Sequence, residues 1–341
     1  MKALSEWVKL PDTNKRNIFA ETARRKALPI FSIEKDWWVV HTLSALFSTK
    51  YADKLIFKGG TSLSKGWNLI ERFSEDIDLV LDREFLGFAG DLSNKQIHKL
   101  RYASYEFIST KFVAALDLSF KNMGFENVIV KPQEVANHDQ DPLIIEIYYP
   151  KLTGNDIYLH PDILVEIGSR SLKEPFSQRN INTFVSETFA EIPFAEIPFA
   201  ESQIIVPTVN PERTFLEKVF LLHEEYQRPP EKIRVERLSR HLYDIEKLSQ
   251  TPYFQKAMND KELYHTIIAH REKFSRLGGV DYTKHLPEYI RIIPPENLLP
   301  LWEDDYERMK NSMIYGEKIS FSELIMRIDK VQKTINKSVT D

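Results

Sequence analysis

Hydrophobic and polar residues follow two different periods in the first two thirds of the chain. A turn and cap at Pro11-Asp12-Thr13 predict a helix through about Lys26. Apolar residues recur at helical spacing at about residues 33–48, and Ser32 is the predicted N-cap of this second helix. The segment Asp76–Leu81 begins by alternating acidic and apolar residues, which predicts a strand with both acids on one face. A long helix is predicted at about residues 94–123. Further strands are predicted at Leu55–Phe57, Val128–Lys131, Leu143–Tyr149 and Ile163–Gly168.

The last third of the chain, after Pro211, has a mainly helical pattern. Before it, residues 189–201 repeat Phe-Ala-Glu-Ile-Pro, and a proline at every fifth residue predicts an extended surface segment. We therefore expect an α/β (α+β) fold with a mixed sheet flanked by helices in residues 1–206 and a helical C-terminal domain in residues 207–341. The C-terminal helices are predicted at about residues 212–227, 231–248, 260–277 and 320–337.

The composition is that of an ordinary globular protein. The chain has 341 residues, of which 42% are hydrophobic and 28% charged, so a sizeable buried core is expected. The net charge of −4 gives no sign of nucleic-acid binding by the whole chain, and any site for a polyanion is local. The absence of cysteine excludes disulfides, thiolate zinc sites and a cysteine nucleophile. Neither a signal peptide nor a membrane span is predicted, so we expect a cytoplasmic protein with no membrane partner.

A pair of glycines is the first candidate functional motif. Gly59 and Gly60 follow a predicted strand and precede a predicted helix, where backbone amides can approach a phosphate closely. Thr61 and Ser62 add hydroxyl donors. The motif is not a P-loop, because Lys58 precedes the glycines instead of following them.

Two aspartates form the second motif, about fifteen residues later. Aspartate is depleted in strands, so Asp76 and Asp78 on one strand face are unfavourable unless a cation binds there. Carboxylates are typical ligands of Mg²⁺, with Mn²⁺ as the alternative ion, and such ions also bind the phosphates of a nucleoside triphosphate. Either motif alone is more often a turn or a solvated strand face. Their order of strand, turn, helix and strand favours phosphate chemistry.

The segment Leu55–Leu79, which contains Arg-Phe-Ser-Glu-Asp-Ile-Asp-Leu, closely resembles the AbiEii/AbiGii family of nucleotidyltransferase toxins. Residues 34–37, Glu-Lys-Asp-Trp, resemble a helix that commonly precedes this block in the family. Residues 212–218 and 240–244 resemble two later motifs, so the resemblance extends over about residues 34–248. It implies a nucleotidyltransferase fold and a role in phage defence or a type IV toxin–antitoxin system.

The resemblance also implies roles for individual residues. Asp76 and Asp78 would bind the metal ion, and Lys218 and Asp244 would join them as catalytic residues. The nucleotide and its phosphates would be bound by Lys58, Gly59, Gly60, Thr61, Ser62, Lys65, Lys218 and Arg240. Read without the resemblance, Lys218 is a surface lysine, and Arg240 and Asp244 are an ordinary helical pair four residues apart.

Nucleotidyltransferase folds often have a third metal-binding carboxylate. Glu166 is the candidate, because an acid within an apolar strand is unfavourable to bury without a partner. Glu146, in the preceding apolar strand, is the rival candidate. For either acid the alternative role is an ion pair with a nearby arginine such as Arg170.

A locally basic stretch lies in the helical half of the chain. Arg234, Arg237 and either Arg240 or His241 align at helical spacing within the helix predicted at residues 231–248. Arg228 and Lys232 are the other basic residues of the stretch. It is either a solvated helix face or a local site for an RNA backbone or a triphosphate.

The leading hypothesis is a metal-dependent nucleotidyltransferase that transfers a nucleotide from a nucleoside triphosphate to RNA, in the first place tRNA. As a toxin it would have a cognate antitoxin as protein partner. One alternative keeps the chemistry and changes the acceptor to a protein or small-molecule hydroxyl. The other is a catalytically silent nucleotide-binding or interaction module, against which the intact Gly-Gly and Asp-x-Asp motifs argue.

Overall fold

The computed structural model of the chain describes residues 2–154, 160–169, 174–190 and 203–338. The chain forms two compact units, which we call the sheet unit (Met1–Trp67 and Phe73–Val209) and the helical unit (Asn68–Arg72 and Asn210–Asp341). The sequence placed a single boundary after residue 206. The structure assigns residues 207–209 to the sheet unit and the short segment 68–72 to the helical unit. That the units are separate domains stays a prediction.

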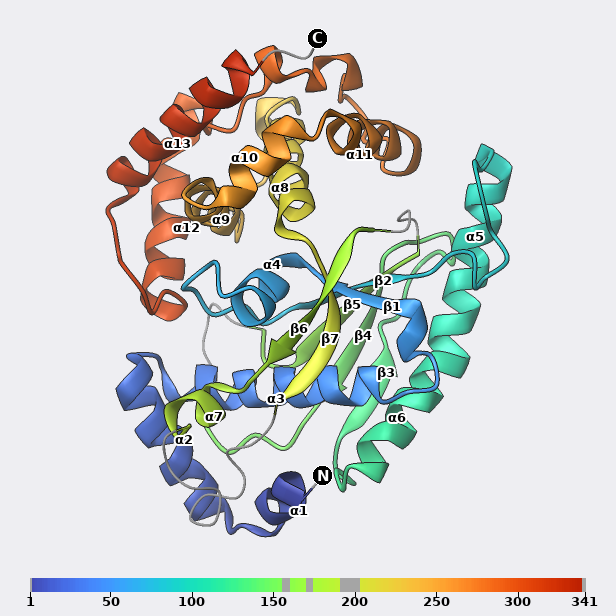
Figure 1. Cartoon of the computed structure of the whole chain (residues 1–341), viewed down its shortest axis with the longest axis vertical. Helices are drawn as coiled ribbons and strands as arrows, with labels where there is room; N and C mark the ends of the chain where they lie inside the picture. The colour runs from blue at the N-terminus through green and yellow to red at the C-terminus, as the bar shows by residue number, and fades with distance from the viewer. Residues whose placement is uncertain (1, 155–159, 170–173, 191–202, 339–341) are drawn as a thin grey trace. The chain divides into compact units, whose positions relative to one another are not determined.

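The described part of the sheet unit contains one seven-stranded sheet with the order β3-β4-β5-β2-β1-β7-β6 (Figure 1). Strand β2 runs parallel to β5 and β1 runs parallel to β7, whereas the other neighbours are antiparallel. The predicted mixed sheet flanked by helices is therefore confirmed. The strands are β1 (Leu55–Lys58), β2 (Ile77–Leu81), β3 (Ile129–Pro132), β4 (Leu143–Tyr148), β5 (Ile163–Gly168), β6 (Phe176–Ile181) and β7 (Ile204–Val209).

The central strands β1, β2 and β5 have one buried and one half-open face. Phe57, Leu79 and Val165 and their alternate neighbours are fully buried, whereas the intervening residues are half-buried, except Val80 of β2, which is also buried. Because successive side chains of a strand point to opposite faces, the buried face is the apolar one. The half-open face contains the charged residues of these strands.

The helices of the sheet unit flank this sheet. They are α1 (Lys2–Lys9), α2 (Asp12–Lys26), α3 (Ile30–Phe47), α4 (Gly59–Thr61), the π-helical turn η2 (Ser62–Gly66), α5 (Asn94–Glu106), the π-helical segment η3 (Phe107–Phe112), α6 (Val113–Asn122) and α7 (Phe184–Thr188). Figure 1 shows α3 running across the strands. The predicted N-cap Ser32 of this helix is wrong. Pro29 precedes the first turn with extended backbone angles, so α3 begins at Ile30 and buries Ser32 inside it.

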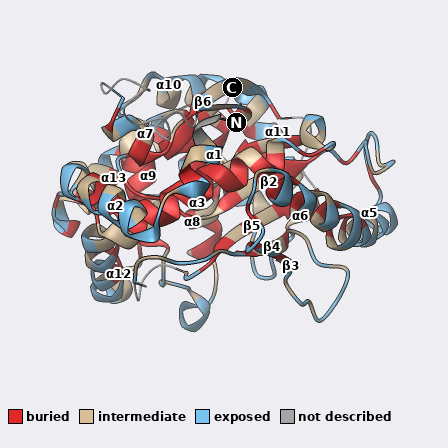
Figure 2. Cartoon of the chain, turned by 90° about the horizontal axis from the view of Figure 1, so that it is seen from below, coloured by how far each residue is buried: buried red, intermediate tan, exposed pale blue. Residues whose placement is uncertain are grey.

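Helix α3 is buried on nearly all sides. Fourteen of its eighteen residues are buried, and the red colour in Figure 2 follows most of its length. Trp37 stacks on Trp7 of α1 with the ring centroids 4.8 Å apart and lies edge-on to Trp38 at 5.0 Å. These tryptophans belong to the core. A helix buried all round has no solvent face for charged residues, so its charged side chains need partners inside the protein.

The helical unit is built from six α-helices among its described residues. They are α8 (Pro211–Glu225), α9 (Ser239–Ser249), α10 (Pro252–Asn259), α11 (Lys261–Phe274), α12 (Leu299–Ser312) and α13 (Phe321–Lys337). This unit also has the short helical turns η4 (Pro230–Lys232), η5 (Tyr282–His285), η6 (Pro287–Tyr289) and η7 (Glu296–Leu298). The corresponding short turn of the sheet unit is η1 (Ala52–Lys54). No helix in the described residues is long and apolar enough to cross a bilayer.

One helix predicted for the second unit is wrong in its first half. Residues 233–238 are not helical, and Arg237 has a positive φ of 61°. Arg234 and Arg237 therefore do not share a helix face with Arg240. Arg228 and Arg234 instead pair with Glu225 at 2.8 and 2.7 Å. Arg170 and residues 191–201 of the Phe-Ala-Glu-Ile-Pro repeat lie outside the described residues.

His41 of α3 is a buried titratable group of the sheet unit. Its Nδ1–H donates to the carbonyl oxygen of Trp37 at 2.7 Å, and its ring stacks on that indole at 3.8 Å. Burial lowers the pKa of His41 to about 4, although the bond to the Trp37 carbonyl acts in the opposite direction. In the unfolded chain the imidazole binds a proton near pH 6.5, so the folded state loses stability as the pH falls from about 6.5 toward 4.

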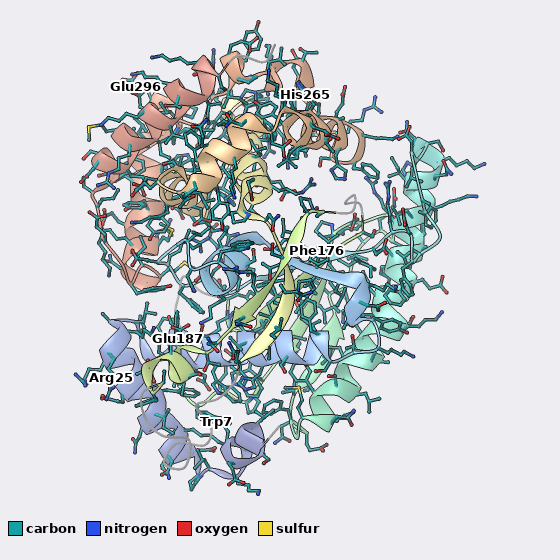
Figure 3. All side chains as sticks on the ribbon, viewed as in Figure 1. Trp7, Arg25, Phe176, Glu187, His265 and Glu296 are labelled. Atoms are coloured by element: carbon teal, nitrogen blue, oxygen red, sulfur yellow. The ribbon has the colours of Figure 1, made fainter. Side chains whose placement is uncertain are left out.

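We predict that the His41→Gln variant has a weaker pH dependence of unfolding than the wild type. The wild type should lose about 2 kcal/mol of unfolding free energy between pH 7 and pH 5 through this one group. Urea unfolding at the two pH values, followed by tryptophan fluorescence, measures the difference. The exposed His265, labelled in Figure 3, provides the control variant His265→Gln, which should keep the wild-type pH dependence. Equal pH dependence in all three proteins would contradict the prediction.

Candidate active site

The glycine turn at the end of β1 brings the backbone against a carboxylate. Gly59 has a φ of 79°, a conformation that side chains other than glycine adopt only with strain. A Cβ atom at this position would overlap Oδ2 of Asp78. Gly59 is therefore required twice, by its backbone conformation and by the close approach of Asp78. The helical turns α4 and η2 start here, so their first amides lie beside this acid.

Strand register places three charged residues in one row on the half-open face of the sheet. Lys58 of β1 is the direct partner of Asp78 of β2, and Asp78 is the direct partner of Glu166 of β5. Direct partners on neighbouring strands have Cβ atoms about 5 Å apart. A cation and two carboxylates thus lie next to each other at the strand ends that adjoin the glycine turn.

The register favours Glu166 over its rival Glu146 as the third acid. Glu146 lies on β4, two strands away from β2, and is paired with Leu164 instead of Glu166. Its carboxylate also has other partners, because it accepts hydrogen bonds from the hydroxyl of Tyr148 and, at 3.4 Å, from Nε2 of Gln133. The role of Glu166 as a metal ligand stays a prediction.

Strand β2 begins at Ile77, one residue later than the sequence predicted, so Asp76 directly precedes the strand instead of starting it. The backbone carbonyl of Asp76 accepts a hydrogen bond from the hydroxyl of Thr61, whose oxygen also lies 3.0 Å from the hydroxyl oxygen of Ser74. The hydroxyl of Ser62 donates to the carbonyl of Gly59 at 2.8 Å. Both hydroxyls are buried. That of Thr61 connects the glycine turn to Ser74 and Asp76, and that of Ser62 bonds within the turn. Contacts of Thr61 and Ser62 with a triphosphate stay predictions.

The acids of this site have the chemistry of a magnesium site. Within the described ranges of the chain, no three acidic or histidine side chains are close enough together to form a complete metal cage. Mg²⁺ does not need one, since it usually binds one or two carboxylates and takes its other oxygens from substrate phosphates and water. Asp78, held against the glycine turn, and the neighbouring Asp76 therefore suit an ion that arrives with a nucleotide.

Lys65 of η2 lies in a buried cluster of charges. Its ammonium is 2.7 Å from Oδ1 of Asp36 and 3.6 Å from Oε1 of Glu187, which is labelled on α7 in Figure 3. It also lies 3.9 Å from the centre of the Phe184 ring, and only 4% of its side chain is exposed. Burial raises the pKa of Asp36, although the charge of Lys65 acts in the opposite direction. These contacts give Lys65 a structural role, and the expected phosphate contact stays a prediction.

The helical unit has its own cluster of charged residues, around Asp244 of α9. Asp244 accepts two hydrogen bonds from the guanidinium of Arg72, at 2.7 and 2.8 Å, and pairs with the ammonium of Lys218 on α8 at 2.9 Å. Lys218 in turn lies 3.5 Å from Nδ1 of His241. All of these residues except His241 are buried, and Asp244 is completely so. The structure therefore joins Lys218 and Asp244 directly, which the sequence motifs did not predict.

The two cations keep Asp244 ionised. Burial by itself raises the pKa of this carboxyl, but the charges of Arg72 and Lys218 outweigh it and hold the pKa well below its usual range. Burial lowers the pKa of Lys218, with the charge of Asp244 opposing this effect. Arg240, half-buried on α9, is close enough for its charge to lower the pKa of Lys218 as well.

Arg72 is the residue of this cluster that sequence reasoning missed as a functional candidate. It lies in the Arg-Phe-Ser-Glu-Asp-Ile-Asp block, only four residues before Asp76. The available signal was its place in the block that carries the family resemblance, next to the acids. Its partner Asp244 is 172 residues away in the sequence, so no local pattern predicts the pair.

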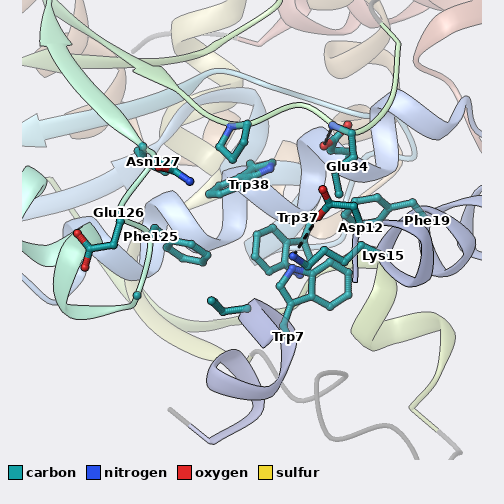
Figure 4. Close-up of a pocket in the computed structure, with 15 residues that line it drawn as sticks. Trp7, Asp12, Lys15, Phe19, Glu34, Trp37, Trp38, Phe125, Glu126 and Asn127 are labelled. Carbon is teal, nitrogen blue, oxygen red and sulfur yellow. Dashed lines mark hydrogen bonds and ion pairs between the residues drawn. The ribbon is translucent and has the colours of Figure 1, made fainter. Parts of the chain in front are cut away.

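A cavity of about 370 Å³ lies elsewhere in the sheet unit, between α1, α2, α3 and the turn after α6 (Figure 4). Its walls include the rings of Trp7, Trp38 and Phe125, and the carboxylate of Glu34. None of the site residues predicted from the sequence lines it. The cavity is therefore distinct from the row of charged residues on the sheet.

Comparison with protein families gives a match to the nucleotidyl transferase AbiEii toxins of type IV toxin–antitoxin systems, over residues 41–327. The chain belongs to this family. The family resemblance predicted from the sequence is thus confirmed, and AbiEii membership makes the protein a nucleotidyltransferase and the toxin of a toxin–antitoxin pair. A nucleoside triphosphate substrate and an antitoxin partner follow from this membership. Nucleotidyltransferases in general also use a divalent metal.

Two solved structures resemble this AbiEii chain. MenT4, a nucleotidyltransferase toxin from Mycobacterium tuberculosis H37Rv, is 18% identical with a TM-score of 0.55, covering 95% of this chain and 91% of MenT4. JHP933 from Helicobacter pylori is 15% identical with a TM-score of 0.37, covering 89% of this chain and 94% of JHP933. The likeness to MenT4 supports the fold. No curated protein sequence matches the chain significantly.

We predict that Gly59→Ala abolishes nucleotide transfer, with a loss of about 100-fold or more, because the new Cβ displaces the Asp78 carboxylate. Gly87→Ala is the matched control. Gly87 has a φ of 88°, so its substitution introduces similar backbone strain, but a Cβ there meets nothing within 4 Å. Kinetic assays of both variants measure the effect. An equal loss of activity in the Gly59→Ala and Gly87→Ala variants would show that backbone strain causes the loss. It would contradict the importance of the contact between Gly59 and Asp78.

We predict that Asp244→Ala lowers the unfolding free energy by about 3–5 kcal/mol, because it leaves Arg72 and Lys218 as buried charges without their carboxylate. Asp304→Ala is the control for losing an exposed ion pair. Asp304 pairs with Arg308 on the surface of α12 at 3.2 Å, and its removal should change stability by about 0.5 kcal/mol or less. Urea unfolding curves compare the two. Similar small effects would show that the Asp244 cluster is not a closed network.

Proposed function

We propose that this toxin transfers a nucleotide from a nucleoside triphosphate to an RNA, in the first place tRNA, in a magnesium-dependent reaction at Asp76 and Asp78. The observation that carries the proposal is the contact between the glycine turn and the row of charged residues on the sheet. Gly59 abuts Asp78, and Asp78 is flanked in register by Lys58 and Glu166. An arrangement of backbone amides, one lysine and carboxylates has groups for both a polyphosphate and its metal ion.

Each group has a separate part in the proposed reaction. The first amides of the helical turn at Gly59 and Gly60 donate to phosphate oxygens, and Lys58 adds a positive charge beside them. Asp76 and Asp78 hold the metal, with Glu166 as the third acid. Magnesium would supply charge neutralisation of the phosphates and activation of the attacking oxygen. The parts expected of Lys218, Asp244 and Arg240 toward the nucleotide stay predictions.

The acceptor is the least constrained element of the proposal. A free hydroxyl of RNA is a suitable nucleophile for in-line attack on the α-phosphate, with pyrophosphate as leaving group. The protein has no overall positive charge, and the predicted basic stretch is partly neutralised by Glu225. RNA binding therefore depends on local contacts. Action on tRNA agrees with the cytoplasmic location expected from the sequence, which also stays a prediction.

The test is a transfer assay with the purified full chain, magnesium chloride, each labelled nucleoside triphosphate in turn and total cellular RNA. We expect label from one nucleotide in a tRNA-sized band. The label should disappear in the Asp76→Ala, Asp78→Ala double variant and on removal of magnesium with EDTA, because the metal ligands or the metal are then lost. Manganese chloride, added after EDTA, tests the alternative ion.

The control variant is Asp53→Ala, Asp117→Ala, which removes two carboxylates from surface ion pairs of the sheet unit. It should keep full activity. Label in a protein band without RNA would replace the RNA acceptor by a protein hydroxyl. Label that survives loss of Asp76 and Asp78 would contradict the assignment of the active site.

A further inference from the structure

Helix α3 contains three consecutive charged residues that are all buried. Glu34, Lys35 and Asp36 are exposed by only 2%, 3% and 1%. Consecutive helical residues point about 100° apart, so the three side chains reach different parts of the sheet unit. A buried charge without a partner is strongly unfavourable, and each of the three therefore has one.

The partners of this triplet come from five separate places in the chain. Glu34 accepts hydrogen bonds from the amides of residues 152 and 153 at 2.7 and 2.8 Å. Asp36 pairs with Lys65 of η2 at 2.7 Å and accepts from the amide that starts α7 at 2.6 Å. Lys35 donates to Oε2 of Glu75 and to the carbonyl of His160. One turn of helix thus fixes several connections that border the glycine turn and the acid strands.

Lys35 holds the two segments that lead to the acids. Glu75 immediately precedes Asp76, and its second oxygen lies 3.4 Å from the amide of His160. His160 precedes β5, the strand of Glu166, by three residues. The ammonium of Lys35, the carboxylate of Glu75 and the backbone of His160 therefore form one closed group that ties the entry of β2 to the entry of β5.

We propose that Lys35 is a positioning residue for nucleotide transfer, acting through Glu75 to orient the carboxylate of Asp76. The inference rests on the proposed function, in which Asp76 holds the metal. Lys35 itself reaches neither substrate nor metal in this role. It fixes the peptide that carries Asp76, and its loss lets that carboxylate move relative to Asp78.

Stability alone does not account for a buried pair at this place. A buried lysine–glutamate pair loses its hydration, and apolar residues of similar volume often give an equally stable protein. An apolar pair, however, makes no directional hydrogen bonds. The ammonium aims at one carboxylate oxygen and one carbonyl, and so defines the position of the backbone next to Asp76.

The double variant Lys35→Met, Glu75→Gln tests the proposal, because it removes both charges and avoids leaving one of them unpaired. We expect kcat to fall about 100-fold, as for a misplacement of about 1 Å at a reacting centre. The KM for the nucleoside triphosphate should stay within about 3-fold, since the glycine turn is untouched. The magnesium concentration for half-maximal activity should rise, and the melting temperature should stay near the wild-type value.

Arg101→Met, Asp139→Asn is the control, a less buried ion pair of the sheet unit in which Asp139 also pairs with His98. It should keep the wild-type kcat and magnesium dependence. If the Lys35–Glu75 double variant does not fold, Glu75→Asp replaces it. This variant keeps the charge pair but draws the carboxylate back by one methylene, and it should lower kcat about 10-fold and raise the magnesium requirement.

The outcomes separate this inference from the proposed function. A folded double variant, or a folded Glu75→Asp variant, with wild-type kcat and magnesium dependence would overturn the positioning role of Lys35. If Asp76→Ala is inactive in the same assay, the proposed function stands even though the positioning role of Lys35 has failed. If Asp76→Ala keeps full activity, the proposed function itself has failed, and the positioning role fails with it.

Discussion

The need to pair buried charges is the constraint on which the sheet unit depends most. Helix α3 lies in the interior and still carries Glu34, Lys35 and Asp36 in a row. Each charge is tolerable only if another segment comes to it with an opposite charge or a set of hydrogen-bond donors. The loops that surround the candidate site are thus held by electrostatic contacts from one helical turn, while the apolar core supplies most of the remaining stability.

The row of charged residues on the sheet, Lys58, Asp78 and Glu166, is held in place by strand pairing. Asp78 and Glu166 are direct partners on the parallel strands β2 and β5, and Lys58 is the direct partner of Asp78 on the antiparallel strand β1. Apolar residues alternate with these charges and fill the buried face, so the same strands serve the core on one side and the site on the other. Gly59 completes the arrangement, since only a residue without Cβ leaves space for the Asp78 carboxylate.

Sequence patterns predicted the local parts of this architecture well. Strand β5 and the start of β4 were expected where they occur, because short apolar runs between turn residues leave few alternatives. The patterns failed where long-range contacts decide. Strand β6 has a mixed pattern, and its pairing with β7 forms it. Residues 233–238 look helical, yet Glu225 and Asp305 bind this stretch in another conformation. Arg72 was missed as a functional residue because its partner, Asp244, is distant in sequence.

The motif Arg-Phe-Ser-Glu-Asp-Ile-Asp combines anchoring and chemistry in seven residues. Arg72 is bound within the helical unit by Asp244, and Glu75 is bound within the sheet unit by Lys35, with only Phe73 and Ser74 between them. Both intervening residues are buried, so the segment has little conformational freedom at either end. Asp76 follows directly after the second anchor. In the proposed function, the ion pairs of Arg72 and Glu75 hold the segment that leads to this acid.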